Sequence, residues 1–286
     1  MAVGTTPEIR PEQRAAALAG SRYELIPIRG MLDEAKKLPA GAAIAVTCSP
    51  RHGIERTLEG AIALKAAGFH AIPHIAARLL RNPQEVEAVM TRIHQAGFDD
   101  VYVIAGDIDT PAGEFASALP VLEIISRMET RPTHIGIPGY PEGHALIGEA
   151  VLDEAITAKM AHADYVVTQM CFDPDRIGAW LRRHAAPQTG LTAWIGVPGV
   201  LETRRLLSIS LKIGVGQSLK SLRRNQGLTG QLLHGHYTPE ALIDALLPVV
   251  ADPMVQVSGF HLNTFNTIGP LLDWRATFLG AAKTRG

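Results

Sequence analysis

The sequence predicts an α/β protein that folds as a single-domain (β/α)8 TIM barrel, and three features lead to this prediction. Short apolar runs rich in β-branched residues recur along the chain, as is typical of strands buried on both faces. Helical patterns separate these runs at intervals of roughly 25–30 residues, which favours parallel strands joined by helices. The chain of 286 residues also has the length of one such barrel.

Eight apolar runs are the predicted strands. Their regular alternation with helical patterns favours a closed barrel, with a doubly wound open sheet as the alternative. The eight runs are Tyr23–Ile28, Ala42–Thr47, His70–Ala76, Asp100–Gly106, Thr133–Gly139, Tyr165–Met170, Thr192–Gly199 and Gln256–Leu262.

Three helices carry clear end signals in the sequence. The first ends at Gly68, which suits the left-handed residue after a helix. The second begins with Asn82 as its N-cap and Pro83 in its first turn, and the third begins in a similar way at Thr238 and Pro239. These helices are predicted over 53–68, 82–97 and 238–251.

The whole chain, residues 1–286, is predicted as one domain with two additions to the barrel. Residues 1–20 are expected to form an N-terminal helical extension. The interval 200–255 is long enough for extra helices before the last strand.

Composition and charge narrow the class of protein. Hydrophobic residues make up 47% of the chain and charged residues 19%, as in a folded protein with a sizeable core. The formal net charge is −1 and no block of basic residues occurs, so no nucleic-acid partner is expected. No secretory signal and no apolar run of ~18 residues is present, so a cytoplasmic protein without a membrane partner is expected. Association into a homo-oligomer is left open.

Polar residues cluster at the predicted carboxyl ends of the strands, where active sites of such barrels lie. Glu24 stands inside an apolar strand, where a carboxylate is costly unless it is paired or used. It could form a salt bridge to Arg29, or act as a general acid whose pKa apolar surroundings raise. Asp107 could cap a turn or face a ligand. The full set is Glu24, Thr47, His74, Asp107, Tyr140, His144, Gln169, His261 and Asn263.

Familiar cofactor and metal motifs are missing. His74 and His144 are possible metal ligands, but neither has a second ligand at a suitable spacing, so no metal is expected. Neither a glycine-rich dinucleotide fingerprint after the first strand nor a Walker sequence is present. A dinucleotide would therefore bind at the barrel's open end.

Seven segments in chain order resemble the methylenetetrahydrofolate reductase family, one for nearly every predicted strand. The most specific are GYPEGH, similar to the family's AYPEVHP, and VVTQMCFD, similar to AITQFFFD. The others are YELIPIRG, AVTCSP, IPHIA, VIAGD and GFHLNTFN.

This resemblance implies a barrel that carries FAD and reduces 5,10-methylenetetrahydrofolate to 5-methyltetrahydrofolate, with NAD(P)H as co-substrate, in one-carbon metabolism and methionine biosynthesis. Glu24 matches the family's catalytic acid, and Asp107 the aspartate between flavin and folate. Gln169 matches a folate contact, and Asn263 occupies another folate-contacting position. The flavin contacts implied are Thr47, His74, Asp107, Tyr140, His144 and Lys159. The direction of flux and the choice between NADH and NADPH are left open.

The chain departs from the family at several charged positions. Ala105, Ala155 and Ala158 stand where the family has arginine, asparagine and arginine near the flavin. Asn263 and Thr267 stand where it has tyrosine and arginine near the folate. Two alternatives follow: a flavin-free reductase with direct hydride transfer from NAD(P)H to folate, and a non-catalytic folate-binding subunit.

Overall fold

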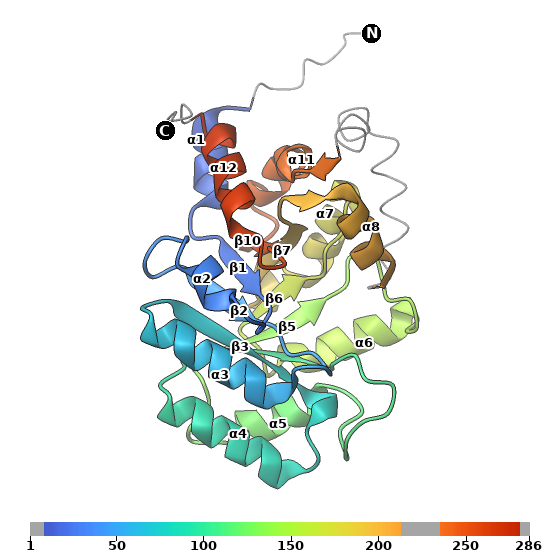
Figure 1. Cartoon of the computed structure of the whole chain (residues 1–286). Helices are drawn as coiled ribbons and strands as arrows, with labels where there is room; N and C mark the ends of the chain where they lie inside the picture. The colour runs from blue at the N-terminus through green and yellow to red at the C-terminus, as the bar shows by residue number, and fades with distance from the viewer. Residues whose placement is uncertain (1–8, 213–234, 281–286) are drawn as a thin grey trace.

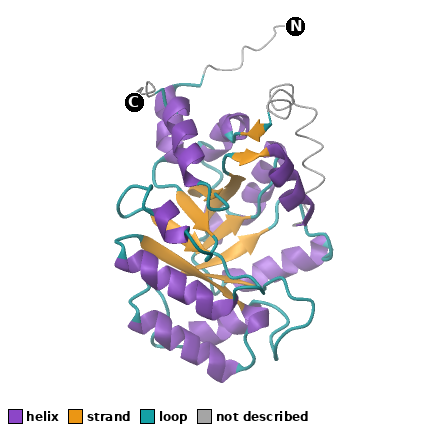
Figure 2. Cartoon of the chain, in the orientation of Figure 1, coloured by secondary structure: helices purple, strands orange, loops and turns teal. Residues whose placement is uncertain are grey.

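The computed structural model describes residues 9–212 and 235–280. Eight strands close into a barrel in the order β1-β10-β7-β6-β5-β4-β3-β2, and β1 pairs with both β2 and β10 in parallel. Figure 2 shows the strands at the centre with helices around them. The predicted barrel is confirmed, and the open-sheet alternative is wrong because no edge strand is left.

The observed barrel strands overlap all eight predicted runs, with differences only at their ends. A separate antiparallel pair, β8 (Leu201–Glu202) and β9 (His236–Tyr237), lies outside the barrel sheet. The barrel strands are β1 (Arg22–Leu25), β2 (Ala43–Val46), β3 (His70–Ala76), β4 (Asp100–Ile104), β5 (His134–Gly139), β6 (Tyr165–Thr168), β7 (Thr192–Pro198) and β10 (Val257–Asn263).

Helix ends follow the local signals closely. Gly68 lies just beyond α3 with φ +89°, and Asn82 Oδ1 accepts a hydrogen bond from the Glu85 amide at 3.0 Å at the start of α4. α11 begins one residue later than expected, with Pro239 as its N-cap. The helices are α1 (Pro11–Leu18), α2 (Met31–Ala35), α3 (Gly53–Ala66), α4 (Pro83–Gln95), α5 (Leu119–Ser126), α6 (Glu149–Met160), α7 (Pro174–His184), α8 (Thr203–Lys212), α11 (Glu240–Val250) and α12 (Ile268–Phe278), with 3₁₀ turns at Ala77–Leu79 and Pro187–Thr189.

Helices also occupy the two intervals predicted as additions to the barrel. α1 lies beside α12 in Figure 1. The Arg14 guanidinium of α1 stacks over the Phe278 ring of α12, 4.3 Å from its centroid. Arg14 also pairs with Asp244 of α11 at 2.6 Å. α8 and α11 fall within 200–255, and residues 213–234 between them lie outside the described part of the chain.

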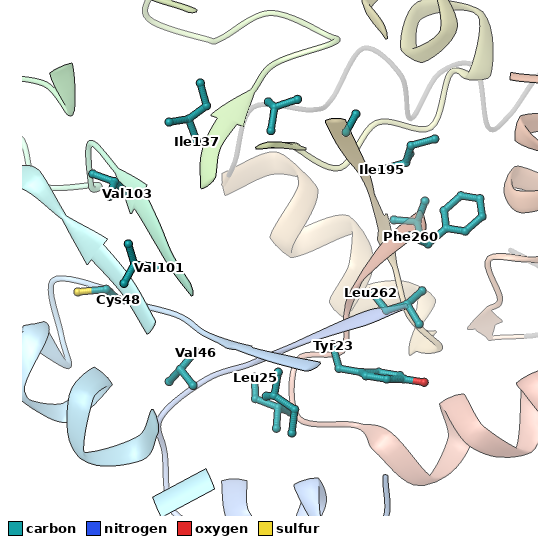
Figure 3. Close-up of a cluster of buried hydrophobic side chains, with 14 of the residues drawn as sticks. Tyr23, Leu25, Val46, Cys48, Val101, Val103, Ile137, Ile195, Phe260 and Leu262 are labelled. Atoms are coloured by element: carbon teal, nitrogen blue, oxygen red, sulfur yellow. The ribbon is translucent and has the colours of Figure 1, made fainter. Parts of the chain in front are cut away.

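The main hydrophobic core lies between the strands and the surrounding helices (Figure 3). Leu25, Val103, Ile137 and Phe260 come from four different strands, and all are fully buried. This packing explains why the strands read as continuous apolar runs, because each buries its outer face under helices and its inner face inside the barrel.

A charged and aromatic plug fills the amino end of the barrel interior. Arg22 pairs with Asp100 at 3.0 Å, and Tyr165 donates a hydrogen bond to the same carboxylate at 2.7 Å. The Arg22 guanidinium lies between the rings of Tyr165 and Trp194, at 4.3 Å from each centroid. Glu24 follows Arg22 by two residues, so it projects into the same interior about 6–7 Å nearer the carboxyl end.

Candidate active site

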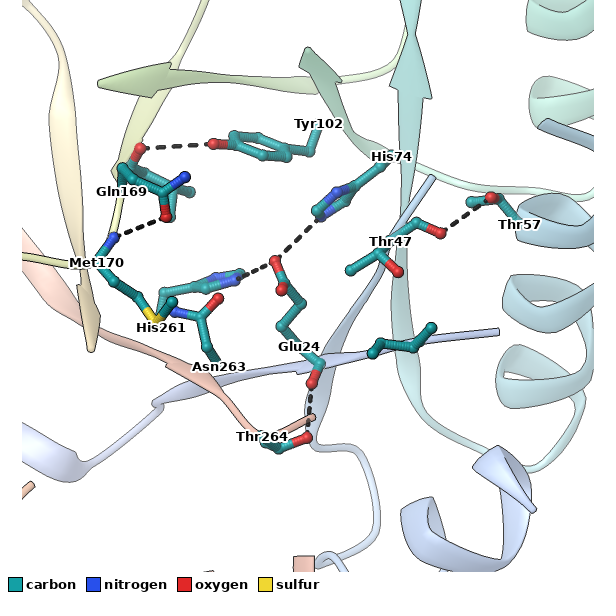
Figure 4. A network of polar contacts seen from close by, with 12 residues as sticks. Glu24, Thr47, Thr57, His74, Tyr102, Gln169, Met170, His261, Asn263 and Thr264 are labelled. Atoms are coloured by element: carbon teal, nitrogen blue, oxygen red, sulfur yellow. Dashed lines mark hydrogen bonds and ion pairs between the residues drawn. The ribbon is translucent and has the colours of Figure 1, made fainter. Parts of the chain in front are cut away.

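Glu24 is the charged centre of the site at the carboxyl end of the barrel. Its Oε2 lies 3.2 Å from His261 Nε2 and 3.9 Å from His74 Nε2, and both rings point toward the carboxylate in Figure 4. The Glu24 side chain is 20% exposed, whereas the His261 side chain is 3% exposed. Its partners are therefore buried histidines, and the salt bridge to Arg29 considered from the sequence does not occur.

The pKa of Glu24 differs from the expectation. Burial has the largest single effect and raises it, but the hydrogen bond from His261 and the electrostatic effects of His261 and His74 together lower it by more, so the net pKa lies below the usual value. Burial has the dominant effect on His74, whose pKa falls from 6.5 to about 4. His74 is therefore neutral at physiological pH, and in that state it does not hold Glu24 in its charged form.

Strand register brings these groups together. Glu24 on β1 is paired in register with Asn263 on β10, and His261 lies one tier lower, opposite Arg22. The Glu24 carbonyl oxygen accepts a hydrogen bond from the Thr264 hydroxyl at 2.7 Å, which anchors the end of β1 to the segment after β10. Barrel closure therefore builds the acid's surroundings from opposite ends of the chain.

The inner wall beside His74 is aromatic. The ring of Tyr102 on β4 meets His74 edge-on, with centroids 4.6 Å apart. The Tyr102 hydroxyl donates to the Val167 carbonyl at 3.5 Å. Burial raises the pKa of Tyr102 well above its usual value, so Tyr102 contributes a neutral ring to the site.

Three further predicted residues accompany Glu24 in Figure 4. Gln169 follows β6 directly, is half-buried, and accepts a hydrogen bond from the Met170 amide at 2.9 Å through Oε1. Asn263 is buried, and its amide donates to the Val197 carbonyl at 3.3 Å. Thr47 follows β2, and its carbonyl accepts from Thr57 at 3.0 Å. These groups give the opening neutral polar surroundings.

Asp107 lies outside this network. It follows Gly106, which takes the left-handed conformation with φ +95°, and its side chain is exposed. Burial and the nearby charge of Asp107 raise the pKa of Tyr140 to about 12. Asp107 therefore lies near Tyr140, a residue of the neighbouring pocket.

That pocket, of about 570 Å³, opens between α6, α7 and the loop that follows β5. Three predicted cofactor residues line it together: Tyr140, His144 and Lys159. The rings of Tyr140 and His144 meet edge-on, with centroids 5.5 Å apart. The structure thus gathers these three residues, from the turn after β5 and from α6, around one cavity large enough for a cofactor-sized ligand.

Sequence reasoning missed the contribution of α7 to the pocket. Arg176, Trp180 and Arg183 line its wall, at the spacing of one helix face. The spacing of these residues predicts only that they share one face of a helix. It does not predict that this face lies opposite α6. Arg183 pairs with Asp153 of α6 at 2.5 Å, which joins the two helices across the pocket.

Lys159 is the cation of the pocket that no carboxylate neutralises within the described residues. Burial lowers its pKa. The nearby Asp153 is engaged by Arg183 at 2.5 Å and by His184 at 3.3 Å. A half-buried ammonium in this position is suited to an anionic ligand.

Residues 9–212 and 235–280 contain no group of three or more His, Cys, Asp or Glu side chains arranged to hold a metal ion. Within the same ranges, no helix is both long enough and apolar enough to span a bilayer.

Comparisons with known proteins agree with the resemblance noted in the sequence. The profile of the family described as methylenetetrahydrofolate reductase matches residues 29–267. A stretch of 122 residues is 28% identical to methylenetetrahydrofolate reductase 1 of Schizosaccharomyces pombe, and this match covers 39% of the chain and only 20% of that protein.

Similar solved structures include two described as deoxyribose-phosphate aldolase from Toxoplasma gondii ME49. Both have a TM-score of 0.48, with 12% and 11% sequence identity. The alignments cover 93% and 96% of this chain and 98% and 97% of the aldolase chains.

Proposed function

The chain belongs to the methylenetetrahydrofolate reductase family, and from this we propose that it is an oxidoreductase that interconverts 5,10-methylenetetrahydrofolate and 5-methyltetrahydrofolate. The observation that supports the proposal most directly is the position of Glu24. This acid lies in the open end of the barrel, held by a buried histidine and surrounded by neutral polar groups. Such a site can supply one proton to a bound ring system.

The proposed reaction needs a proton and a hydride. Opening the methylene bridge breaks one carbon–nitrogen bond, and Glu24 gives its proton to the nitrogen that leaves. The carbon becomes an iminium, which accepts the hydride to form the methyl group. Asp107, exposed at the rim, can stabilise the cationic iminium, and Gln169 offers both a donor and an acceptor to the pterin edge.

The pKa of Glu24 must rise for this step, and ligand binding provides a cause. In the free site the pKa lies below the usual value, although burial pushes it upward. A flat ring system over the opening removes the remaining water from the carboxylate, and this desolvation favours the protonated acid. His74 adds no opposing charge at neutral pH, because its own pKa is about 4.

The groups that line the neighbouring pocket support FAD as the cofactor, because they suit its adenine and its phosphates. Lys159, Arg176 and Arg183 would hold its phosphates, Tyr140 and His144 would contact it at the barrel rim, and Trp180 offers a ring to the adenine. Its volume of about 570 Å³ suits part of this ligand. FAD, when bound, supplies a two-electron carrier between NAD(P)H and the folate.

A second candidate is a flavin-free reductase in which NAD(P)H transfers hydride directly to the folate. The observation that favours it is the absence of polar side chains at Ala105, Ala155 and Ala158, where the resemblance implies flavin contacts. Ala158 is exposed and Ala105 and Ala155 are half-buried, so none of them is a core position that requires alanine.

The absorbance spectrum of the purified protein, recorded before and after addition of FAD, separates the two candidates. A flavin band that remains after gel filtration supports the flavoprotein. Oxidation of NAD(P)H that depends on methylenetetrahydrofolate, with no flavin band even after FAD addition, supports the direct reductase. No folate-dependent oxidation under either condition contradicts the proposed reaction.

Glu24→Gln tests the acid directly. The variant should lower kcat by about 10²–10⁴-fold, the usual contribution of a general acid, and leave folate affinity within a few-fold of the wild type. The exposed Glu129→Gln is the matched control and should reduce the folate at the wild-type rate. Equal turnover by both variants would remove Glu24 from the mechanism.

A further inference from the structure

Among the described side chains, His261 hydrogen-bonds to the Glu24 carboxylate. Its Nε2 lies 3.2 Å from Oε2, within hydrogen-bond distance, whereas His74 Nε2 lies at 3.9 Å, beyond it. Both histidines are almost completely buried, with side-chain exposures of 3% and 5%. The position of the acid is therefore set mainly by one hydrogen bond from β10.

The second nitrogen of His261 indicates which atom carries the proton. Nδ1 is buried and has no hydrogen-bond partner among the described residues. A doubly protonated ring would leave a buried, charged N–H without an acceptor, which costs more than a bare lone pair. The neutral tautomer with the proton on Nε2 leaves Nδ1 without a proton that would need an acceptor, and it donates its one N–H to Glu24.

This bond makes the two oxygens of Glu24 unequal. Oε2 accepts from His261, and no hydrogen bond reaches Oε1 from the residues that the structure describes. When the carboxyl group is protonated, Oε2 continues to accept as the carbonyl oxygen, and the proton belongs on Oε1. The partly exposed side chain opens toward the end of the barrel where the folate is proposed to bind.

We infer that His261 is a positioning residue for the reaction: it donates Nε2–H to Oε2 of Glu24 and so leaves Oε1 to carry the proton toward the leaving nitrogen of the folate. The inference rests on the proposed function, because the proposed reaction transfers this proton to the folate. After transfer the carboxylate keeps the same hydrogen bond, so His261 neither gains nor loses a proton in the step.

The other groups around Glu24 do not offer the same contact. His74 on β3 is too distant for a hydrogen bond, and Tyr102 on β4 directs its hydroxyl to the Val167 carbonyl. The side-chain amide of Asn263 on β10 donates to β7. Within the described network, His261 therefore supplies the side-chain hydrogen bond that orients the acid.

Two substitutions form a matched test. His261→Gln places an amide N–H near the position of Nε2 and should keep kcat within about threefold of the wild type. His261→Asn places its amide nearer the position of Nδ1, loses the donor, and should lower kcat by about tenfold to a hundredfold with little change in KM. Equal losses in both variants would contradict the inference.

The titration of Glu24 is the readout that a merely structural role would not change. Losing the donor in His261→Asn should raise the pKa of Glu24 and move the alkaline limb of kcat/KM to higher pH, whereas His261→Gln should keep the wild-type profile. Infrared difference spectra of the carboxyl group, assigned with Glu24→Gln, follow this titration without turnover. An unchanged pKa in His261→Asn would overturn the inference. A shifted pKa in a protein that does not reduce the folate would overturn the proposed reaction and support the contact.

If the asparagine variant does not fold, the wild type still allows a decision. Side-chain ¹⁵N NMR of His261 should show a protonated Nε2 and a bare Nδ1, and the Nε2 signal should shift in Glu24→Gln. A proton on Nδ1 with a bare Nε2 would contradict the proposed donor.

Discussion

At the scale of single residues, the two ends of the barrel interior use charge differently. Arg22 and Asp100 at the amino end are paired, hydrogen-bonded and stacked between aromatic rings, so their charges are fully engaged. Glu24 at the other end has one hydrogen bond to His261 and partial exposure. The first arrangement stabilises the fold, and the second leaves an oxygen available for chemistry.

Asp100→Asn should lower the free energy of unfolding by about 3–5 kcal/mol, because it leaves the Arg22 guanidinium without its charged partner inside the barrel. Tyr165→Phe, which removes only the 2.7 Å hydrogen bond to Asp100, should cost about 1–3 kcal/mol. Urea unfolding followed by circular dichroism measures both changes. A midpoint for Asp100→Asn equal to that of the wild type would show that the plug adds no stability.

Lys159→Met tests the proposed cofactor pocket. Loss of a charge-assisted contact of about 1.5–3 kcal/mol should weaken FAD binding by at least about tenfold. Quenching of flavin fluorescence on titration with protein measures the affinity. Lys36→Met is the control, because Lys36 is exposed and pairs with Asp33 on α2, away from the pocket. Equal affinities for both variants would place the phosphates elsewhere.

At the scale of elements, the inner face of the barrel restricts side-chain size at certain strand positions. A Cβ atom on Gly196 of β7 would lie 2.0 Å from the Thr168 carbonyl oxygen, a backbone atom that cannot move aside cheaply. Thr168 also accepts a hydrogen bond from the Gly196 amide at 2.9 Å through its side chain. β6 and β7 therefore approach closely here because one of them lacks a side chain.

Gly196→Ala should destabilise the protein by about 3 kcal/mol or more, since the strands must separate to admit the methyl group. Gly148→Ala is the matched control, because the added Cβ has no neighbour within 4 Å and the residue lies at a negative φ of −66°. Thermal unfolding of the two variants gives the comparison. A melting temperature for Gly196→Ala close to that of Gly148→Ala would contradict the close approach.

The elements themselves could be predicted well from the sequence. Strands buried on both faces give continuous apolar runs, and helix ends such as Gly68 and Asn82 are set by local chemistry. The candidate site could be predicted only in part. Glu24 was conspicuous because a carboxylate interrupts an apolar strand, and Tyr140 and His144 because they share a short turn.

The remaining contacts depend on tertiary packing. Glu24 and His261 are 237 positions apart and meet only because β1 and β10 close the barrel. Arg176 and Trp180 face the pocket only because α7 packs beside α6. The expected rise in the pKa of Glu24 was wrong for the same reason, since the sequence showed its apolar neighbours and gave no sign that a histidine donates to it.

At the scale of the whole molecule, the architecture gives the barrel one closed end and one end that holds the candidate site. The ion pair and the rings of the plug fill the amino end, so a ligand approaches from the carboxyl end. The Glu24 network lies at this carboxyl end, and Tyr140, which follows β5, lines the α6–α7 pocket. The proposed hydride chemistry needs both sites, because the proton donor and the cofactor must serve the same substrate.

Buried histidines also make the stability of the whole fold depend on pH. His74 has a pKa of about 4 in the folded protein, compared with the ordinary value of 6.5 in the unfolded chain. Between these two pH values the unfolded chain binds more protons than the folded one, so acidification favours unfolding. At ~1.4 kcal/mol per pH unit, the full loss on descending through this window is about 3 kcal/mol. Glu24, whose pKa is lowered from 4.5, adds a further loss below that value.

His74→Gln should therefore flatten the decline in unfolding free energy between pH 6.5 and 4. His70 provides a contrast of opposite sign, because the Asp100 carboxylate, 3.8 Å from its Nε2, raises its pKa. A histidine whose pKa is raised by folding stabilises the folded protein fully when the pH is below the pKa of the unfolded chain. This stability is lost as the pH rises through the pKa of the folded protein. Because His70 stabilises the protein at low pH, His70→Gln should make the protein more sensitive to acid. Urea midpoints measured across this range test both signs together. If His74→Gln declined with acid as steeply as the wild type, the buried imidazole would not be neutral in the folded barrel, and its positive charge beside Glu24 would oppose the proposed acid.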